Sequence, residues 1–156
     1  MEAEADADDD GTAGTTQRLG HALLMLEGAY RDLRASMARD LGLSDAEFQA
    51  LTAVAGSSGC TPKMLGLELS MTTGAVTALI DRLDRAGLLT RLPNPRDRRS
   101  VFLTPTSHGV DLLDEVIRWH DAAVREMQRV SPRLADSTVV EDLTRAAAVL
   151  AAHSVG

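Results

Sequence analysis

The sequence predicts a mainly α-helical fold with one small β-hairpin, and three observations support this prediction. Apolar residues recur every three or four positions through most of the chain after residue 14, as they do on one face of an amphipathic helix. Ser or Thr residues that can cap a helix precede several of these segments. One β-rich run, 100–103, follows a proline-braced turn. With 156 residues, the chain can bury the core of one domain.

The first 14 residues are acidic and small, and they contain no large apolar side chain after Met1. Such a segment cannot offset the entropy lost on ordering, so we expect residues 1–14 to form a disordered acidic tail. Its first ten residues hold 6 of the 23 acidic residues, whereas the rest of the chain holds 17 acidic and 16 basic residues. The net charge of −7 is therefore concentrated in the tail, and a basic patch elsewhere remains compatible with a nucleic-acid partner.

Residues 15–43 are predicted to form a long amphipathic helix. Its apolar stripe consists of Leu19, Leu23, Leu26, Tyr30, Leu33, Met37 and Leu41. Gly20 and Gly28 would each weaken the isolated helix by about 1 kcal/mol. Packing against a partner must therefore stabilise this segment.

Two helix starts follow. Ser44 can cap a helix over residues 44–56, and Glu47, three residues later, can complete a capping box. Thr61 and Pro62 form the second start, a cap followed by proline at the first helical position, for a short helix.

A third helix is predicted to begin at Thr72 and to end at Gly87 in a Schellman cap. Its apolar stripe has i, i+3, i+4 and i+7 spacing and consists of Val76, Leu79, Ile80 and Leu83. Two short runs, 89–92 and 100–103, then predict a β-hairpin.

The C-terminal segment, 105–156, is predicted to be helical again. The pair Thr104-Pro105 repeats the cap-and-proline start and is expected to begin a long helix that continues to about Val130. The pair Ser131-Pro132 interrupts this helix, and a last amphipathic helix spans about 137–152.

The segment 44–104 thus contains a helix, a short helix, a turn, a helix and a basic hairpin, which is the order of a winged helix-turn-helix. In this motif the second helix lies in the major groove of DNA, with its N-terminal residues near the base edges. Short hydroxyl side chains allow close approach, and a helix N-terminus attracts phosphate oxygens. The predicted DNA-contacting residues of this helix are Thr72, Thr73, Gly74, Thr77 and Arg85. The alternative is that these threonines are helix caps and solvated surface, above all Thr72.

The hairpin tip provides concentrated positive charge, because residues 91–99 hold four Arg and one Asp. Arg96, Arg98 and Arg99 lie within four residues on a proline-braced turn. Such a cluster is suited to insertion into the minor groove, where the potential of DNA is most negative.

Residues 65–104 resemble the winged-helix core of the MarR family of bacterial repressors. Residues 65–91 are similar to its helix-turn-helix, and the run Asn-Pro-Arg-Asp-Arg-Arg-Ser-Val-Phe-Leu-Thr at 94–104 matches its wing signature. The resemblance implies that Arg99 reaches the minor groove and that Asp97 orients it. It extends over about residues 16–153 and implies that 15–43 and 105–156 are dimerisation helices.

In this family, small molecules bind in a cleft between the dimerisation helices and the winged core. The resemblance therefore suggests a small-molecule effector, with Tyr30, Trp119 and His120 as the polar and aromatic lining of its site.

The sequence departs from the family pattern at three places. Ala78 stands where many members carry Arg on the recognition helix. The glycine that follows the wing corresponds either to the place of Ser107 or to Gly109. Cys60 lies outside the first helix, where the peroxide sensors of the family carry cysteine, so we expect a buried or inert thiol.

We therefore expect a homodimer that binds double-stranded DNA at a pseudo-palindromic operator, represses transcription and is released by a small-molecule effector. The cytoplasm, with association to the nucleoid, is the expected location, because no signal sequence or membrane span is apparent. The four histidines have no His or Cys neighbours at ligand spacing, and no nucleotide-binding motif is present. Neither a metal, nor a cofactor, nor an enzymatic activity is expected. The alternative is a winged-helix protein-interaction module without specific DNA binding; the acidic tail and Ala78 favour it, and the four-Arg wing opposes it.

Overall fold

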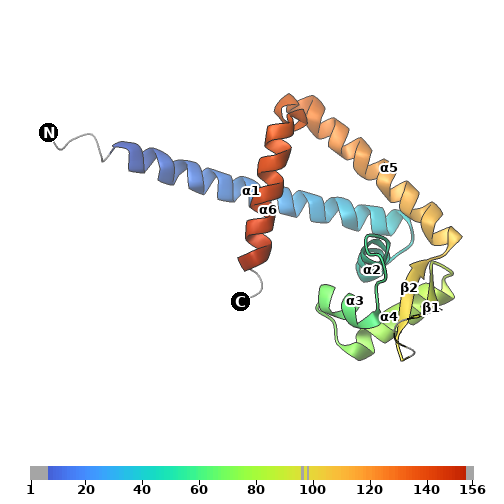
Figure 1. Ribbon diagram of the computed structural model, residues 1–156. Helices are drawn as coiled ribbons and strands as arrows, with labels where there is room; N and C mark the ends of the chain where they lie inside the picture. The colour runs from blue at the N-terminus through green and yellow to red at the C-terminus, as the bar shows by residue number, and fades with distance from the viewer. Residues whose placement is uncertain (1–6, 96, 98, 154–156) are drawn as a thin grey trace. The chain divides into compact units, whose positions relative to one another are not determined.

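The structure is a computed structural model that describes residues 7–95, 97 and 99–153 (Figure 1). It consists of two compact units, residues 1–109 and 110–156. The first unit contains α1 (Ala7–Asp40), α2 (Asp45–Ala55), α3 (Pro62–Glu68), α4 (Thr73–Arg85), β1 (Leu89–Pro93) and β2 (Val101–Pro105). The helix α5 (Ser107–Val130) leads into the second unit, which also contains the 3-10 turn η1 (Pro132–Ala135) and α6 (Ser137–His153). The predicted fold class, mainly helical with one antiparallel hairpin, is confirmed.

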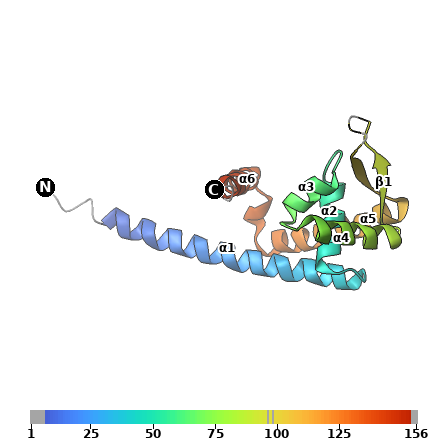
Figure 2. The same cartoon turned by 90° about the horizontal axis from the view of Figure 1, so that it is seen from below.

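The hydrophobic core of the first unit forms around α4, which packs against α2, α3 and β1. Figure 2 shows these elements clustered at the C-terminal end of α1. The predicted apolar stripe of α4 is entirely buried, with Val76, Leu79, Ile80 and Leu83 each no more than 2% exposed. The neighbouring elements contribute the buried side chains Leu51, Val54, Leu65, Leu89 and Leu103. Burial of one face of α4 leaves its opposite face in solvent.

The three predicted helix starts inside this unit are confirmed. The Ser44 hydroxyl accepts the backbone N–H of Glu47 at 3.3 Å, and the Ser44 N–H donates to the Glu47 carboxylate at 2.9 Å, which completes the capping box. The hydroxyls of Thr61 and Thr72 each accept the backbone N–H three residues on, at 3.3 and 3.4 Å. These caps fix where α2, α3 and α4 begin.

The turn between α3 and α4 is tight because α4 lies close to the α3 backbone. A Cβ at Gly66 would lie 3.2 Å from a methyl group of Val76, closer than most such contacts. Ser70 adopts a φ of 52°, and the N–H of Met71 donates to the Gly66 carbonyl at 2.9 Å. This turn sets the crossing of the two helices.

A Schellman cap ends α4, as predicted. Gly87 has a φ of 70°, its N–H donates to the Asp84 carbonyl, and the N–H of Leu88 donates to the Leu83 carbonyl, both at 2.9 Å. The chain then enters β1, which pairs with β2 from Leu89–Pro105 to Pro93–Val101. The cap therefore determines where the chain leaves α4 and enters the hairpin.

The loop before α3 is attached to the wing through Cys60. The N–H of Leu103 donates to the Cys60 carbonyl at 2.8 Å, and the Cys60 side chain is buried. Burial, with the nearby Glu68 carboxylate, raises the pKa of the thiol. A raised pKa leaves less thiolate at neutral pH and so lowers the reactivity of the thiol. The burial expected from the sequence is confirmed.

Two sequence-based boundaries are wrong. Residues 7–14 belong to α1 rather than to a disordered tail, while residues 1–6 lie outside the described residues. A helix that is already nucleated gains a hydrogen bond with each added residue, and composition does not reveal this.

The second correction concerns the start of α5, because Thr104 and Pro105 belong to β2. The cap is Thr106, whose hydroxyl accepts the N–H of Gly109 at 3.1 Å and donates to the carbonyl of Gly87. Cross-strand pairing therefore extends through the cap-and-proline signal, because β2 is an edge strand of a two-stranded sheet, where proline is tolerated.

The helices α1, α5 and α6 bury few of their side chains. Among the described residues, only Met37 and Ala38 of α1 and Gly109 of α5 are buried, and no residue of α6 is. Their exposed large apolar side chains include Leu19, Leu23, Leu24, Met25, Leu26, Ile117, Met127, Val140, Leu143 and Leu150. No described helix is long and apolar enough to cross a membrane.

We predict that Gly109→Ala lowers the free energy of unfolding by about 1–3 kcal/mol, the cost of overpacking a filled site. A Cβ at Gly109 would lie 2.1 Å from the backbone oxygen of Leu88, so the backbone must move to accept it. Gly56→Ala is the control, since its Cβ would meet no atom closer than 3.5 Å. Urea denaturation measures both changes, and equal effects of the two substitutions would contradict the prediction.

Candidate nucleic-acid interface

The N-terminal half of α4 presents small polar side chains to solvent. The residues predicted to contact DNA, Thr72, Thr73, Gly74, Thr77 and Arg85, are all exposed. A Cβ at Gly74 would meet nothing within 4 Å, so the surface is open there. The buried stripe on the opposite side holds this face outward, in the orientation that major-groove insertion requires.

The threonines of α4 have local hydrogen bonds that determine how they can act. The Thr72 hydroxyl caps the helix, as the alternative for this residue expected, and its contact with DNA stays a prediction. The Thr77 hydroxyl donates to the Thr73 carbonyl at 2.8 Å. With its proton engaged, Thr77 offers an outward acceptor oxygen and a methyl group. The methyl group matches the thymine methyl of the major groove, and the oxygen matches amino donors.

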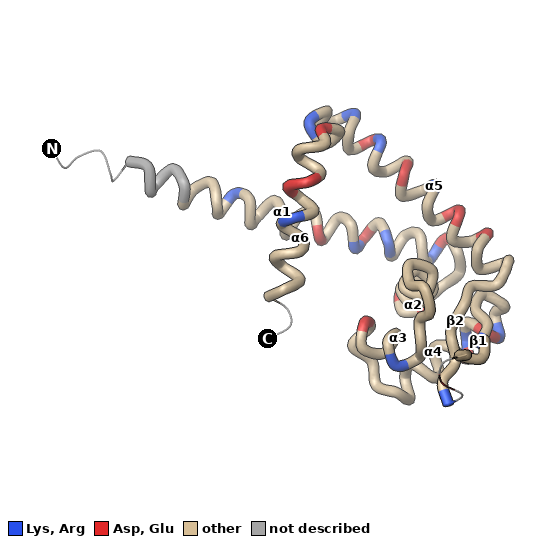
Figure 3. The backbone as a smooth tube through the Cα atoms, viewed as in Figure 1, with Lys and Arg blue, Asp and Glu red and all other residues tan. Residues whose placement is uncertain are grey.

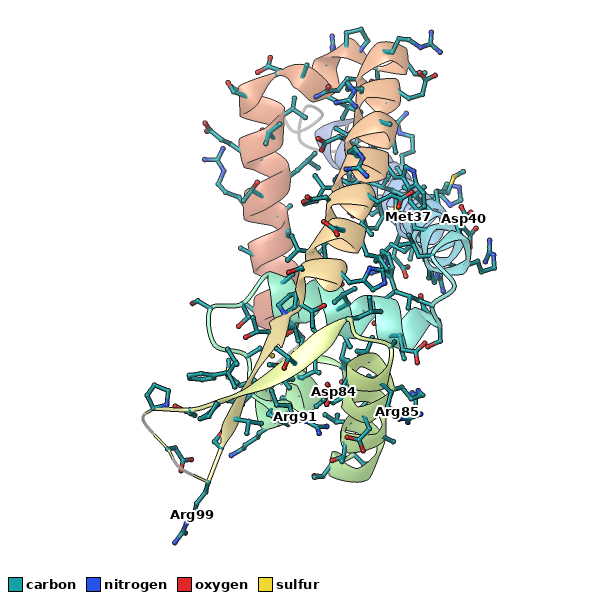
Figure 4. All side chains as sticks on the ribbon, turned by 90° about the vertical axis from the view of Figure 1, so that its right-hand side faces the viewer. Met37, Asp40, Asp84, Arg85, Arg91 and Arg99 are labelled. Atoms are coloured by element: carbon teal, nitrogen blue, oxygen red, sulfur yellow. The ribbon has the colours of Figure 1, made fainter. Side chains whose placement is uncertain are left out.

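Short-range hydrogen bonds order the tip of the wing. The N–H of Asn94 donates to the Ser100 carbonyl at 3.3 Å, and that of Ser100 donates to the Asp97 carbonyl at 3.0 Å. The Asp97 carboxylate accepts the backbone N–H of Arg99 at 2.9 Å. This contact supports the expected role of Asp97, and it acts through the backbone of Arg99. Figure 4 shows the Arg99 side chain pointing away from the hairpin.

Two other arginines of the predicted cluster, Arg96 and Arg98, lie outside the described residues.

A cleft of about 620 Å³ is lined by residues of α3, α4 and the wing. Its lining comprises Thr61, Pro62, Lys63, Gly66, Leu67, Met71, Thr73, Val76, Thr77, Arg99, Ser100 and Val101. The structure therefore brings together Thr73 and Thr77 from α4 and Arg99 from the wing, which the sequence analysis assigned to separate elements. Arg85, in the last turn of α4, does not line this cleft.

Sequence reasoning missed Lys63, which lies in the first turn of α3 and lines the same cleft as Arg99. Figure 3 shows basic residues at the start of α3 and at the end of the hairpin. Lys63 is the single lysine of the chain and follows a cap-and-proline start, but neither feature by itself indicates a DNA contact. The cleft has a cationic residue on each side, as expected for a surface that binds phosphates.

Sequence reasoning also gave no role to Arg91, although it counted this residue among the wing arginines. Its guanidinium contacts the carboxylate of Asp81, and Nη1 lies 3.8 Å from Oδ2 of Asp84. Both aspartates are on α4, whereas Arg91 is on β1. An ionic contact thus links the recognition helix to the wing.

On its other side, α4 is linked to α2. Nε of Arg82 donates to the Glu47 carboxylate at 2.9 Å, and the Glu47 side chain is only 18% exposed. Hydrogen bonds from the backbone and hydroxyl of Ser44, together with Arg82, hold the pKa of Glu47 below its usual value. The carboxylate that caps α2 therefore also positions α4.

The residues suggested for an effector site belong to different units. Tyr30, in α1, is partly exposed, and the guanidinium carbon of Arg34 lies 5.5 Å from the centre of its ring. Trp119 and His120 are half-buried on α5. Their joint role remains a prediction. Among the described residues, no group of three or more His, Cys, Asp or Glu could hold a metal ion.

The α3–turn–α4 arrangement with its antiparallel wing defines a winged helix-turn-helix protein. Residues 41–100, from the loop before α2 to the end of the wing turn, match the model of the MarR family. MarR of Salmonella typhimurium is 30% identical over 97 residues, which cover 62% of this chain and 67% of that protein. The transcriptional regulator MhqR of Bacillus subtilis is 28% identical over 115 residues, or 72% and 79% of the two chains. The chain belongs to the MarR family of transcriptional regulators.

The similarity to a solved structure reaches beyond the residues that match the family model. The structure of a mutant of MarR from Escherichia coli in complex with operator DNA superposes on this chain with a TM-score of 0.56 and 26% sequence identity. The match covers 83% of this chain and 93% of that chain, so it includes elements beyond the winged core.

We predict that Glu47→Gln destabilises the protein by about 1 kcal/mol at neutral pH, the usual contribution of a helix cap. Because folding lowers the pKa of Glu47, its stabilisation is present above the unfolded value, near 4.5, and is lost as the pH falls through the lower, folded value. The stability difference between wild type and variant should therefore shrink at acid pH. Urea denaturation at pH 7 and pH 3 tests this; a difference that grows at pH 3 would refute it.

Proposed function

We propose that this protein is a homodimeric, sequence-specific repressor that binds a pseudo-palindromic operator and is released by a small-molecule effector. The observation that carries the proposal is the shared cleft, in which Thr73 and Thr77 of α4 and Arg99 of the wing border one concave surface. A recognition helix and a wing that face the same cleft can engage adjacent grooves of one duplex.

Each part of the surface has a distinct role in this proposal. The N-terminal half of α4 enters the major groove, where Thr73 and Thr77 face base edges and the N-terminus of α4 faces a phosphate. Arg99 enters the minor groove, where narrow A·T-rich sequence concentrates negative potential. Lys63 neutralises a backbone phosphate. In this proposal, the flanking phosphates of the DNA backbone are contacted by Arg85, Arg96 and Arg98.

The dimer follows from the surface of the terminal helices. The apolar side chains of α1, α5 and α6 remain largely exposed in the single chain, and large exposed apolar surfaces mark interfaces. A second copy has the same surface and can bury it in a two-fold symmetric interface. Two copies of α4 would then read half-sites about one helical turn, roughly 34–36 Å, apart.

Release by an effector requires a ligand that binds the free geometry of the dimer more tightly than the DNA-bound one. Tyr30, Trp119 and His120 are the residues assigned to this ligand. Trp119 is the single tryptophan of the chain, so its fluorescence reports binding directly. A small aromatic compound that releases operator DNA without changing this fluorescence would remove Trp119 from the effector site.

The operator is identified by selection from random duplexes with the full-length protein. We expect enrichment of an inverted repeat and a dimer in sedimentation experiments. The affinity should fall steeply as salt rises, because each neutralised phosphate releases counterions. The alternative is a winged-helix interaction module, which Ala78 on the exposed face of α4 favours because it offers DNA no charge. Selection without enrichment would support that alternative.

We predict that Arg99→Ala weakens binding to the selected operator by about 1–3 kcal/mol, because a minor-groove contact is lost. Asp97→Ala should cost less, and the double substitution should be less than additive, since both act on one side chain. Thr77→Ala should change the preference among operator variants more than the general affinity.

Fluorescence anisotropy with operator and random duplexes at two salt concentrations measures these effects. Urea denaturation serves as the folding control, since Arg99 lies at an exposed tip. Wild-type affinity in folded Arg99→Ala would exclude the wing from the DNA interface.

A further inference from the structure

Among the described residues, two ion pairs that share Arg91 link the wing to α4. The guanidinium of Arg91 on β1 contacts the carboxylate of Asp81 and lies 3.8 Å from that of Asp84. Figure 4 shows Arg91 and Asp84 beside each other, where β1 passes α4. The planar guanidinium carries several donors and can serve two carboxylates at once.

Arg91 lies at the point of β1 where the buried part of the strand ends, so its contact with α4 can restrain the exposed part. Within β1 only Leu89 is buried, and the strand is exposed from Arg91 outward to Pro93. On β1, apolar packing thus holds the base at Leu89, and the strand from Arg91 outward is exposed, whereas on β2 Leu103 is buried and its N–H donates to the Cys60 carbonyl. Arg91 pairs across the hairpin with Leu103, so a constraint on Arg91 also acts on β2.

The two aspartates would oppose DNA binding if they were unpaired. Asp81 and Asp84 are three residues apart and therefore lie on the same face of α4. Their side chains are each 45% exposed, and that of Arg91 is 36% exposed, so the contact adds little to global stability. Its effect is on local geometry and local charge.

We propose that Arg91 is a positioning residue for DNA binding: held by Asp81 and Asp84, it sets the wing against α4 so that Arg99 and the N-terminus of α4 engage the duplex together. This inference rests on the proposed DNA binding. A direct contact from Arg91 to a phosphate is the competing explanation, and it predicts that the effect of Arg91 is independent of the two aspartates.

The test is a double-mutant cycle with Arg91→Met, the pair Asp81→Asn and Asp84→Asn, and the triple variant, measured by anisotropy on the selected operator. We expect Arg91→Met to weaken binding about tenfold in the wild-type background and less than about twofold in the asparagine background, because coupled residues are not additive. Arg91→Lys, which offers a single point charge, should be intermediate. An equal or larger loss in the asparagine background overturns the proposal.

Arg129→Met is the matched control, provided that sedimentation shows the variant to be as dimeric as wild type, because α5 is a proposed dimerisation helix. Arg129 forms an ion pair with Glu126 inside α5, 2.5 Å apart, so its loss removes one charge and one ion pair without loosening a junction between elements. Its affinity should stay within about twofold of wild type, as for a surface pair. A tenfold loss of operator affinity in Arg129→Met would show that the effect of Arg91→Met comes from the change in net charge, and it would overturn the proposal.

Amide hydrogen exchange without DNA separates this inference from the proposed function. In Arg91→Met and in the double asparagine variant, amides of residues 89–92 and 101–104 should exchange faster, while those of the buried part of α4 should not change. Unchanged exchange in the hairpin would refute the positioning role even if all variants bound DNA. If wild type bound no duplex, the proposed function would fail independently of this result.

Discussion

Val76, Leu79, Ile80 and Leu83 of α4 are buried against α2, α3 and β1, and this burial decides which face of α4 remains available. Because a helix has a fixed period, burial of the apolar stripe leaves Thr73 and Thr77 exposed beside it. The caps at Thr72 and Gly87 then set where the face begins and where the chain turns into the wing. Without this packing, the polar residues of α4 would have no fixed direction.

The electrostatics of the molecule are local rather than global. Much of the net charge of −7 comes from the first ten residues, whereas Lys63 and Arg99 flank one cleft. Acidic residues also occur on α4, but Asp81 and Asp84 are paired with Arg91. A small cationic footprint is sufficient for a helix and a wing to approach DNA, because exposed charges beyond about 10 Å are screened at 0.1 M salt.

The winged core and the terminal helices differ in how they are stabilised. The core buries its own apolar side chains, while α1, α5 and α6 leave theirs exposed in the single chain. In the proposed dimeric repressor, the core would contact DNA while the terminal helices would hold two cores at a set spacing. Within the core, the Glu47–Arg82 contact joins α2 to α4.

The sequence alone determined the elements whose causes are local: the capping box at Ser44, the caps at Thr61 and Thr72, the apolar stripe of α4 and the hairpin with its Arg99 tip. These depend on residues a few positions apart, and propensity and periodicity describe such interactions well. The tertiary structure decided what depends on distant residues. It extended β2 through Pro105, selected Gly109 for close contact with Leu88, placed Lys63 in the cleft and paired Arg91 with α4. Cross-strand hydrogen bonds, close backbone approach and ion pairs between elements arise only when the chain folds back on itself, so no local pattern reports them.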